Sequence, residues 1–518
     1  MLCLFGVVLG TDAGMLAHKC EVAVVGAGPG GAYLAWRLSQ TVSAGGVAKQ
    51  VCLFEMGQRV GGRVHSLRKQ GPLHDLTVEA GAYRFALNKT CAPLGTADWC
   101  ISTSVTKHVI VDALKLPYRV YDPSATDWDD KLAKIVDARG EDAGYLTFVE
   151  ALVHAAQASG RARLHLGHEL VRLERHAATG DHTLTFAHGA KATAQHVVLN
   201  LPQYPLMRVL AASVGLSSLG DGATPPVLHA VTSYPLFKLY VHYADAWWRN
   251  DLGLTAGFFN NSAAWKPSND ADPRAIAECF AARQRPAPLQ GAYHDAHVKC
   301  DGPALADGSP RCRGYLQAAY YAEQYAMRFY SQWRTARSGD SVTRLDAKRA
   351  HDAQLFELIH ESLVELHADA LRAAGALERV RAMRPDEAIL SVWDSPVDGI
   401  EAGCHAFQEL GLPTAGSRGI PTARIPAEAV APFSLAPRVF VANEAWGKLQ
   451  CFAEGSLQMA ENIAHAFFGA PPPAWIPERE YREDVLFNVS DVRRAPTHGD
   501  LSLAQAAAVG RAAAGRAS

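Results

Sequence analysis

The sequence lacks three features that would each have pointed to a particular class of protein. It has no excess of charge of one sign, because 50 Lys and Arg residues balance 52 Asp and Glu residues and leave a net charge of −2. Phosphate binding needs a basic surface, so this balance argues against a nucleic acid partner. No apolar run reaches the roughly 18 residues that span a bilayer, so no integral membrane segment is expected. No C-x-x-C pair is present, so no zinc or other metal site is predicted.

The chain otherwise has the composition of an ordinary globular protein. Its 518 residues are 48% hydrophobic and 20% charged, which is enough apolar material to bury a large core. At roughly 150 residues per domain, this length allows two to four domains. Residues 1–19 are interpreted as a leader, because residues 2–10 (LCLFGVVLG) resemble the apolar run of a signal peptide. No Lys or Arg precedes that run, so the alternative is a disordered or packed N-terminal extension.

Cysteines and glycosylation sequons indicate the cellular compartment in which the protein resides. Of ten cysteines, Cys91 and Cys100 bracket one short segment, and Cys300 and Cys312 bracket another, as disulfides do in oxidising compartments. N-x-S/T sequons begin at Asn88, Asn260 and Asn488. Together these features favour a secreted or endomembrane protein, with the cytoplasm as the alternative.

A nucleotide-binding signature begins at residue 21. The stretch EVAVVGAGPGG, followed by AYLAWRLSQ and VCLFE, reads as strand, glycine turn, helix and strand, which is one βαβ unit. Gly26 allows the tight turn, Gly28 lets the backbone approach a pyrophosphate, and Gly31 lets helix and strand pack closely. Glu55 ends the second strand, where its carboxylate can accept the ribose hydroxyls. The pattern predicts dinucleotide binding, and the alternative is a structural glycine turn.

The residues after this unit narrow the family. Arg59, Gly61, Gly62 and Arg63 follow Glu55 closely. E-x-x-x-R-x-G-G-R after GxGxxG resembles the flavin amine oxidases, which include monoamine, polyamine and L-amino acid oxidases. Phytoene desaturases and protoporphyrinogen oxidases share the same beginning. The resemblance implies FAD as the cofactor, and many relatives bind it non-covalently.

The C-terminal half matches the same family. A predicted strand ends at Glu444, Phe452 lies eight residues on, and Ala453 and Glu454 follow it. In the family this spacing places the start of a helix at the flavin. A helix beginning near Glu454 can aim its N–H groups at the pyrimidine ring and stabilise negative charge there. The alternative is an ordinary helix start with an acidic first turn.

Two residues are assigned catalytic roles by the resemblance. Lys238 lies in a segment where relatives place a lysine that holds a water molecule near flavin N5. The alternative is a surface lysine on an alternating strand. Arg84 lies in a segment where L-amino acid oxidases bind the substrate carboxylate, and an arginine fork suits a carboxylate. The alternative is a structural salt bridge, and Tyr83 replaces the methionine of the family pattern.

The resemblance also assigns residues around the flavin ring. Val171 and Trp393 are placed at the cofactor, and Cys404 occupies the position where monoamine oxidases carry a thioether to FAD. Non-covalent FAD with a buried Cys404 is favoured over that linkage. His405 and Phe452 would form the two walls of a cage for the amine, although the cage tyrosines of the family are absent.

These observations predict an α/β plus α+β architecture. A Rossmann-like FAD-binding domain, interleaved with a substrate-binding domain of mixed sheet and helices, is expected from residues 20–86, 160–207 and 389–470. The substrate-binding domain is expected from residues 87–159 and 208–388. A flexible tail is expected from residues 471–518, whose far end has few large apolar residues.

The predicted activity is oxidative deamination of an L-amino acid by hydride transfer to flavin N5, giving a 2-oxo acid, ammonia and hydrogen peroxide. The partners are then a small amino acid or amine and O2, and a homodimer is one expected state. The first alternative is a primary amine or polyamine oxidase. The second is a desaturase, a porphyrinogen oxidase or a flavoprotein without catalysis.

Overall fold

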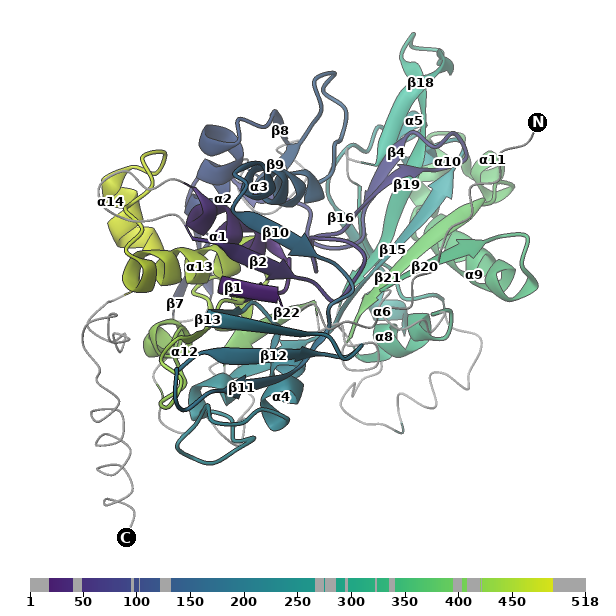
Figure 1. Cartoon of the computed structure of the whole chain (residues 1–518). Coiled ribbons are helices and arrows are strands. Elements are labelled where there is room, and N and C mark those ends of the chain that lie inside the picture. The colour runs from purple at the N-terminus through teal and green to yellow at the C-terminus, as the bar shows by residue number, and fades with distance from the viewer. Residues whose placement is uncertain are drawn as a thin grey trace, which may run out of the picture.

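The computed structural model places two sheets side by side, each with its own core (Figure 1). It describes residues 18–40, 49–94, 97–101, 103–121, 132–265, 274, 286–293, 297–321, 324–334, 341–394, 403–407, 420 and 422–487. Among these residues, no helix is long and apolar enough to cross a membrane.

The first sheet has seven strands around β1, whose residues Val22 to Val25 are all buried. Continuous apolar runs of this kind are typical of parallel strands covered on both faces. Its strands, in spatial order, are β10 (Ala162–His165), β2 (Val51–Phe54), β1 (His18–Val25), β13 (Lys191–Leu199), β12 (His182–Phe186) and β11 (Leu170–Arg175), and β23 (Val439–Val441) also pairs with β13. The pairs β10–β2, β2–β1, β1–β13 and β13–β23 are parallel, whereas β12 is antiparallel to both of its neighbours. The predicted Rossmann-like arrangement is therefore confirmed.

Three helices cover the parallel part of this sheet. They are α1 (Pro29–Ser39), α3 (Leu146–Ala158) and α13 (Ala453–Phe468), and α1 packs against both of the others. α4 (Gln203–Ala211) packs against β11. Figure 1 shows α1, α3 and α13 grouped around β1 and β2, with α4 at the opposite end beside β11.

The second sheet also has seven strands, and all of its pairs are antiparallel. Its order is β16 (Phe258–Asn260), β17 (Gln290–Ala292), β19 (Pro310–Tyr321), β15 (Leu236–Tyr243), β21 (Glu387–Trp393) and β20 (Val342–Asp346), with β18 (Val298–Ala304) on β19. The amphipathic stretch at residues 351–373 forms α9 (Ala350–Leu366) and α10 (Ala368–Ala373). Its periodic leucines and Ile359 join the second core, as an amphipathic pattern predicts.

Shorter elements connect these two parts. The small sheets pair β3 (Ser66–Gln70) with β4 (Leu76–Glu79), β5 (Phe85–Ala86) with β9 (Leu132–Ile135) and β9 with β8 (Tyr118–Val120), β6 (Thr90–Leu94) with β7 (Ala97–Ile101), and β14 (Val231–Tyr234) with β22 (Cys404–Phe407). The remaining helical turns are α2 (Ser104–His108), η1 (Val109–Ala113), η3 (Pro226–His229), α5 (Trp247–Asn250), α6 (Ser262–Trp265), α8 (Gln324–Ser331), α11 (Leu377–Arg381), η5 (Thr422–Arg424), α12 (Ile425–Ala429), η6 (Glu444–Trp446), α14 (Glu478–Glu480) and η7 (Tyr481–Val485).

The boundaries between the parts differ from those expected from the sequence. The helices α2 and α3, expected in the substrate-binding domain, belong to the first core, because α3 packs on α1 and α2 packs on α13. β21, expected in the FAD-binding domain, lies in the second sheet. Residues 471–487, expected to be flexible, bury Tyr481 and Phe487 in the first core. Residues 1–17 of the expected leader and residues 488–518 of the expected tail lie outside the described residues.

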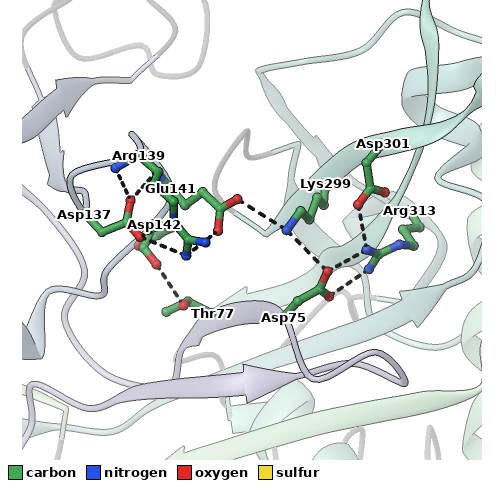
Figure 2. Close-up of polar contacts among 9 residues, drawn as sticks. All are labelled: Asp75, Thr77, Asp137, Arg139, Glu141, Asp142, Lys299, Asp301 and Arg313. Carbon is green, nitrogen blue, oxygen red and sulfur yellow. Dashed lines mark hydrogen bonds and ion pairs between the residues drawn. The ribbon is translucent and has the colours of Figure 1, made fainter.

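A network of charged side chains links β4, a turn around residue 140 and the β18–β19 hairpin (Figure 2). Asp75 accepts two hydrogen bonds from Arg313, at 2.9 and 2.7 Å, and pairs with Lys299 at 3.4 Å. Lys299 also pairs with Glu141 at 3.3 Å. The hydrogen bond from Arg313 lowers the pKa of Asp75, whose side chain is 26% exposed. The network therefore tethers the hairpin of the second sheet to the first half of the chain.

Disulfides join strands within each part. Cys20 is bonded to Cys52 across β1 and β2, and the predicted Cys300–Cys312 pair is confirmed between β18 and β19. A third disulfide joins Cys404 to Cys451. The backbones of β6 and β7 place Cys91 opposite Cys100, but the side chains of these two residues lie outside the described part of the structure.

Candidate active site

A cavity of about 1460 Å³ lies between the two sheets and collects the sequence-predicted residues. The first sheet contributes the end of β1 and the glycine turn after it, as expected for a nucleotide at the carboxyl ends of parallel strands. The second sheet contributes Lys238 of β15, Tyr320 of β19 and Trp393 of β21. The predicted residues at its wall are Gly26, Gly28, Glu55, Arg59, Gly62, Arg63, Arg84, Val171, Lys238, Trp393, Glu444, Phe452 and Ala453.

The glycine turn leaves room for a phosphate group. Gly26 has a φ of +98°, and a Cβ at Gly31 would lie 2.0 Å from the carbonyl oxygen of Gly26, so both positions require glycine. A Cβ at Gly28 would meet its nearest atom, Asn200 Nδ2, at 3.5 Å. Gly28 caps α1 without a side-chain hydrogen bond, so the first N–H groups of the helix are available to an anion.

The loop beside this turn is organised by Glu55. Its carboxylate accepts hydrogen bonds from the backbone N–H groups of Ala27, at 2.9 Å, and Gly57, at 2.8 Å. Arg59 donates to the carbonyl oxygens of Val60, at 3.3 Å, and Gly62, at 2.9 Å. Gly31, beside the glycine turn, and Gly61, in the adjacent loop, do not line the cavity. Val171 does line it, and this residue is 36% exposed.

Lys238 is a buried cation at the substrate end of the cavity. Its Nζ donates to the carbonyl oxygens of Glu79, at 3.1 Å, and Gly81, at 2.5 Å. The same atom lies 4.3 Å from the ring centre of Tyr83 and 5.3 Å from that of Tyr320. Burial lowers the pKa of Lys238 to about 7, although the Glu79 carboxylate opposes that change. Lys238 can therefore exchange a proton near neutral pH.

The Glu79 carboxylate is buried below Lys238. It accepts hydrogen bonds from the Ser66 hydroxyl, at 2.7 Å, and from the backbone N–H of Tyr145, at 2.6 Å. Burial, together with the nearby Asp142, raises the pKa of Glu79 to about 8. The Glu79 side chain does not line the cavity, and no local signal in the sequence indicates its direction.

Arg84 also lines the cavity and is half-buried. Its guanidinium lies 4.8 Å from the ring centre of Tyr83, and its charge contributes to lowering the pKa of Lys238. Among the described residues, no carboxylate forms an ion pair with it, unlike the salt bridge considered as the alternative. The guanidinium fork is thus available to a ligand carboxylate.

Arg63 and Glu444 form a buried ion pair where the two parts meet. Arg63 Nη1 lies 2.6 Å from Glu444 Oε1, and His405 Nδ1 lies 2.6 Å from the same oxygen. Burial alone would raise the pKa of Glu444, but the charges of Arg63 and His405 lower it to about 2. Cys451 donates its backbone N–H to Glu444 Oε2 at 3.0 Å. This network holds β22 against the start of α13.

His405 and Cys404 differ from their predicted positions. The His405 side chain is completely buried against Glu444, so it is not a cage wall at the cavity surface. Phe452 does line the cavity, and Tyr320 lines it where no aromatic residue had been predicted. Cys404 is disulfide-bonded to Cys451 and does not line the cavity, so in this form it has no thiol for a link to FAD.

Glu454 also differs from its prediction. Its carboxylate is buried and accepts hydrogen bonds from the backbone N–H groups of Val105, at 3.0 Å, and Thr106, at 2.8 Å. It therefore holds the first turn of α2, because that helix has no side-chain cap of its own. Ala453 and Ser456, on either side, line the cavity instead.

Asn200 was missed in the sequence. It directly follows β13, lines the cavity, and donates from Nδ2 to the carbonyl oxygen of Gly26 at 3.1 Å. A polar residue directly after a buried parallel strand is a usable signal, because ligands bind at the carboxyl ends of such strands. Tyr320 gave no such signal, since its position depends on the pairing of β19 with β15.

The cavity fits FAD on the chemistry of its wall. The uncapped start of α1 and the glycine turn suit the pyrophosphate, and Glu55 at the end of β2 suits the ribose. The cavity then continues from the first sheet to Lys238 and Trp393 in the second, which leaves space for a flavin ring. When bound, FAD accepts a hydride from the substrate.

Two family models match segments of this chain. The model of an NAD(P)-binding Rossmann-like domain matches residues 24–90, and that of the flavin containing amine oxidoreductases matches residues 119–287. A search of curated protein sequences gave no significant match. A putrescine oxidase double mutant with redesigned cofactor binding is similar at 12% identity, over 86% of this chain and 98% of that chain, with a TM-score of 0.47. Wild-type putrescine oxidase bound to putrescine is similar at 13% identity over the same shares of 86% and 98%, with a TM-score of 0.46.

The two matched segments fall on both sides of the cavity. Residues 24–90 include the glycine turn, Glu55, Arg63 and Arg84, and residues 119–287 include Lys238. These two matches support a protein of the flavin-containing amine oxidase type, an FAD-dependent oxidoreductase that acts on CH–NH2 or CH–NH groups.

Proposed function

We propose that the protein catalyses the oxidative deamination of an L-amino acid, with Arg84 binding the substrate α-carboxylate. The observation that carries this proposal is the guanidinium of Arg84, which lines the cavity beside Lys238 without a carboxylate partner among the described residues. A bidentate guanidinium–carboxylate pair is strong and directional, so it would orient the Cα–H bond of an amino acid. The L configuration follows the resemblance of this segment to L-amino acid oxidases.

The carboxylates at the cavity wall support the same choice. Each of these carboxylates already has a partner. Glu55 accepts hydrogen bonds from backbone N–H groups, Glu444 forms an ion pair with Arg63, and Glu169 lies 3.8 Å from Arg208. Among the described residues at this wall, none is left to bind the second ammonium group of a diamine. The guanidinium of Arg84, which lines the cavity without a carboxylate partner among the described residues, favours an anionic substrate group.

Lys238 has a proton-handling role in this proposal. Two of its three N–H donors are held by the carbonyl oxygens of Glu79 and Gly81, and the third is free to hold a water molecule or the substrate amine. With a pKa of about 7, Lys238 can accept or return a proton during turnover. Tyr83 and Tyr320 enclose the ammonium group and limit its contact with water.

The second candidate is a primary amine or polyamine oxidase. It is favoured by the match of residues 119–287 to the amine oxidoreductases. The aromatic side chains of Tyr83, Tyr320, Trp393 and Phe452 at the cavity wall would also suit the hydrocarbon chain of an amine.

Peroxide release by the purified, FAD-loaded protein across L-amino acids, D-amino acids, monoamines and polyamines separates these candidates. Arg84→Ala is expected to lower kcat/KM for the best L-amino acid by roughly 10-fold to 150-fold, mostly through KM, since a lost charge-assisted pair costs about 1.5–3 kcal/mol. Arg84→Lys should restore part of the loss.

The matched comparison is turnover of the corresponding amine without its carboxylate, which Arg84→Ala should leave unchanged. Arg172→Ala, in an exposed arginine on β11, is the control substitution. Turnover of amines but not amino acids, unaffected by Arg84→Ala, would refute the carboxylate role and establish the second candidate.

A further inference from the structure

We propose that His18, His165 and His168 form a binding site for a divalent transition metal of the zinc class. The cluster lies outside the cavity's substrate end, on the first sheet, and the ligating nitrogens of the three imidazoles lie within 4.8 Å of one another. Three nitrogens that bind a tetrahedral zinc ion at about 2.0–2.1 Å lie roughly 3.4 Å apart. Side-chain rotations that move these nitrogens by about 1 Å therefore complete the site.

The hydrogen bonds of the cluster leave the required lone pairs available. His168 Nδ1 donates to the carbonyl oxygen of Leu166 at 2.8 Å, which leaves Nε2 of that ring as an acceptor. Nε2 of His165 is buried and has no hydrogen-bond partner. A buried imidazole nitrogen without a partner is costly, and a metal ion would satisfy it.

The backbone holds the three residues in place. His165 ends β10, opposite Phe54 of β2, and its ring stacks on that of Phe54 with centres 4.9 Å apart. His18 begins β1, and its ring centre lies 4.4 Å from that of His165. Cys20 follows two residues later on the same face and is bonded to Cys52, which fixes the start of β1 to β2.

The donor set selects the class of metal. Three imidazoles without a carboxylate suit zinc, nickel or copper, whereas magnesium and calcium require oxygen ligands. The spacing in the sequence gave no indication of this site, because His18 and His165 lie on strands that meet through β2. The fourth coordination position is left to water.

The site would also act on the cofactor. The backbone N–H of Glu55 donates to the carbonyl oxygen of His165 at 2.9 Å, and that of His168 donates to the carbonyl oxygen of Glu55 at 2.8 Å. His168 itself lines the cofactor cavity. A metal ion that fixes these histidines therefore fixes Glu55, and it is expected to slow the loss of FAD by about twofold to tenfold.

The test uses the full-length, FAD-loaded protein without a histidine tag, dialysed against a chelator and then titrated with zinc chloride in a calorimeter. We expect about one zinc ion per chain, and His165→Ala and His168→Ala should each weaken binding by about 100-fold or more. His154→Ala, in an exposed histidine on α3, should bind zinc as the unchanged protein does.

A second measurement uses the unchanged protein, so it does not depend on whether a substituted protein folds. Diethyl pyrocarbonate modification, mapped by mass spectrometry with and without zinc, should show protection of His18, His165 and His168 but not of His154. Zinc binding that survives the double substitution of His165 and His168, a stoichiometry far below one, or equal modification of the three histidines with and without zinc would each overturn the proposal.

Discussion

Replacing Glu444 by glutamine should destabilise the protein in a way that depends on pH. The pKa of this carboxyl is lowered from 4.5 to about 2 in the folded protein, because Arg63 and His405 outweigh the effect of burial. At 1.36 kcal/mol per pKa unit, the carboxylate contributes about 3 kcal/mol to the free energy of unfolding. A folded pKa below the unfolded one means that this contribution is complete above about pH 4.5 and is lost as the pH falls towards 2.

Urea unfolding of Glu444→Gln and the unchanged protein, at saturating FAD, measures this difference. The gap should be about 3 kcal/mol near neutral pH and about half of that near pH 3. Glu483→Gln is the matched control, because Glu483 is 60% exposed and pairs with Arg479 four residues away on the surface. That substitution should change stability by less than about 0.5 kcal/mol at either pH. A gap of the same size at both pH values, or one below about 0.5 kcal/mol near neutral pH, would refute the role assigned to the Glu444 charge.

Three further substitutions test other parts of the structure. Lys238→Met should lower kcat by about 100-fold. It should also remove an ionisation near pH 7 from the pH profile of kcat/KM, because Lys238 has a pKa of about 7. An unchanged pH profile would contradict the proton-handling role of Lys238. Gly31→Ala should abolish FAD retention in gel filtration, because its Cβ would lie 2.0 Å from the carbonyl oxygen of Gly26; retention of the yellow colour would contradict the close packing. Tyr481→Ala should cost about 3–5 kcal/mol in urea unfolding, since its ring is buried and its hydroxyl donates to Glu461 at 2.9 Å; a loss below about 1 kcal/mol would mean that this segment is not packed.

The first sheet and its nucleotide turn could be predicted from the sequence because their signals are local. The apolar run before Gly26, the glycine spacing and the carboxylate of Glu55 lie within one βαβ unit, and each reports a backbone requirement. The helix α9 could be predicted for the same reason, because its period is visible in neighbouring residues.

The errors concern side chains whose direction depends on distant residues. His405 turns inward because Glu444, 39 positions later, is its ion-pair partner. Glu454 faces away from the cavity because the backbone of Val105 and Thr106 needs a hydrogen-bond acceptor at that point. The resemblance to the family places these residues near the flavin, but hydrogen bonds to distant residues turn both side chains away from the cavity.

The domain boundaries failed for a related reason. An amphipathic pattern shows that α3 has an apolar face, but it does not show which of the two cores that face joins. In the structure, α3 packs against α1 in the first core. The segment 471–487 differs from the weakly apolar end of the chain, because its Tyr481 and Phe487 are buried in the first core.

The pairing of β13 has a consequence for how the protein is made. This strand is bordered by β1 from the beginning of the chain and by β23 at residues 439–441, and α13 then completes the cavity wall at Ser456. On the ribosome, the N-terminal strands therefore emerge long before the partners that bury them. Because contacts so distant in the chain form slowly, β1 and β2 must persist without their full surroundings during synthesis. A nascent chain that ends before residue 439 should be unable to bind FAD, which makes cofactor capture a late event that reports the completion of the fold.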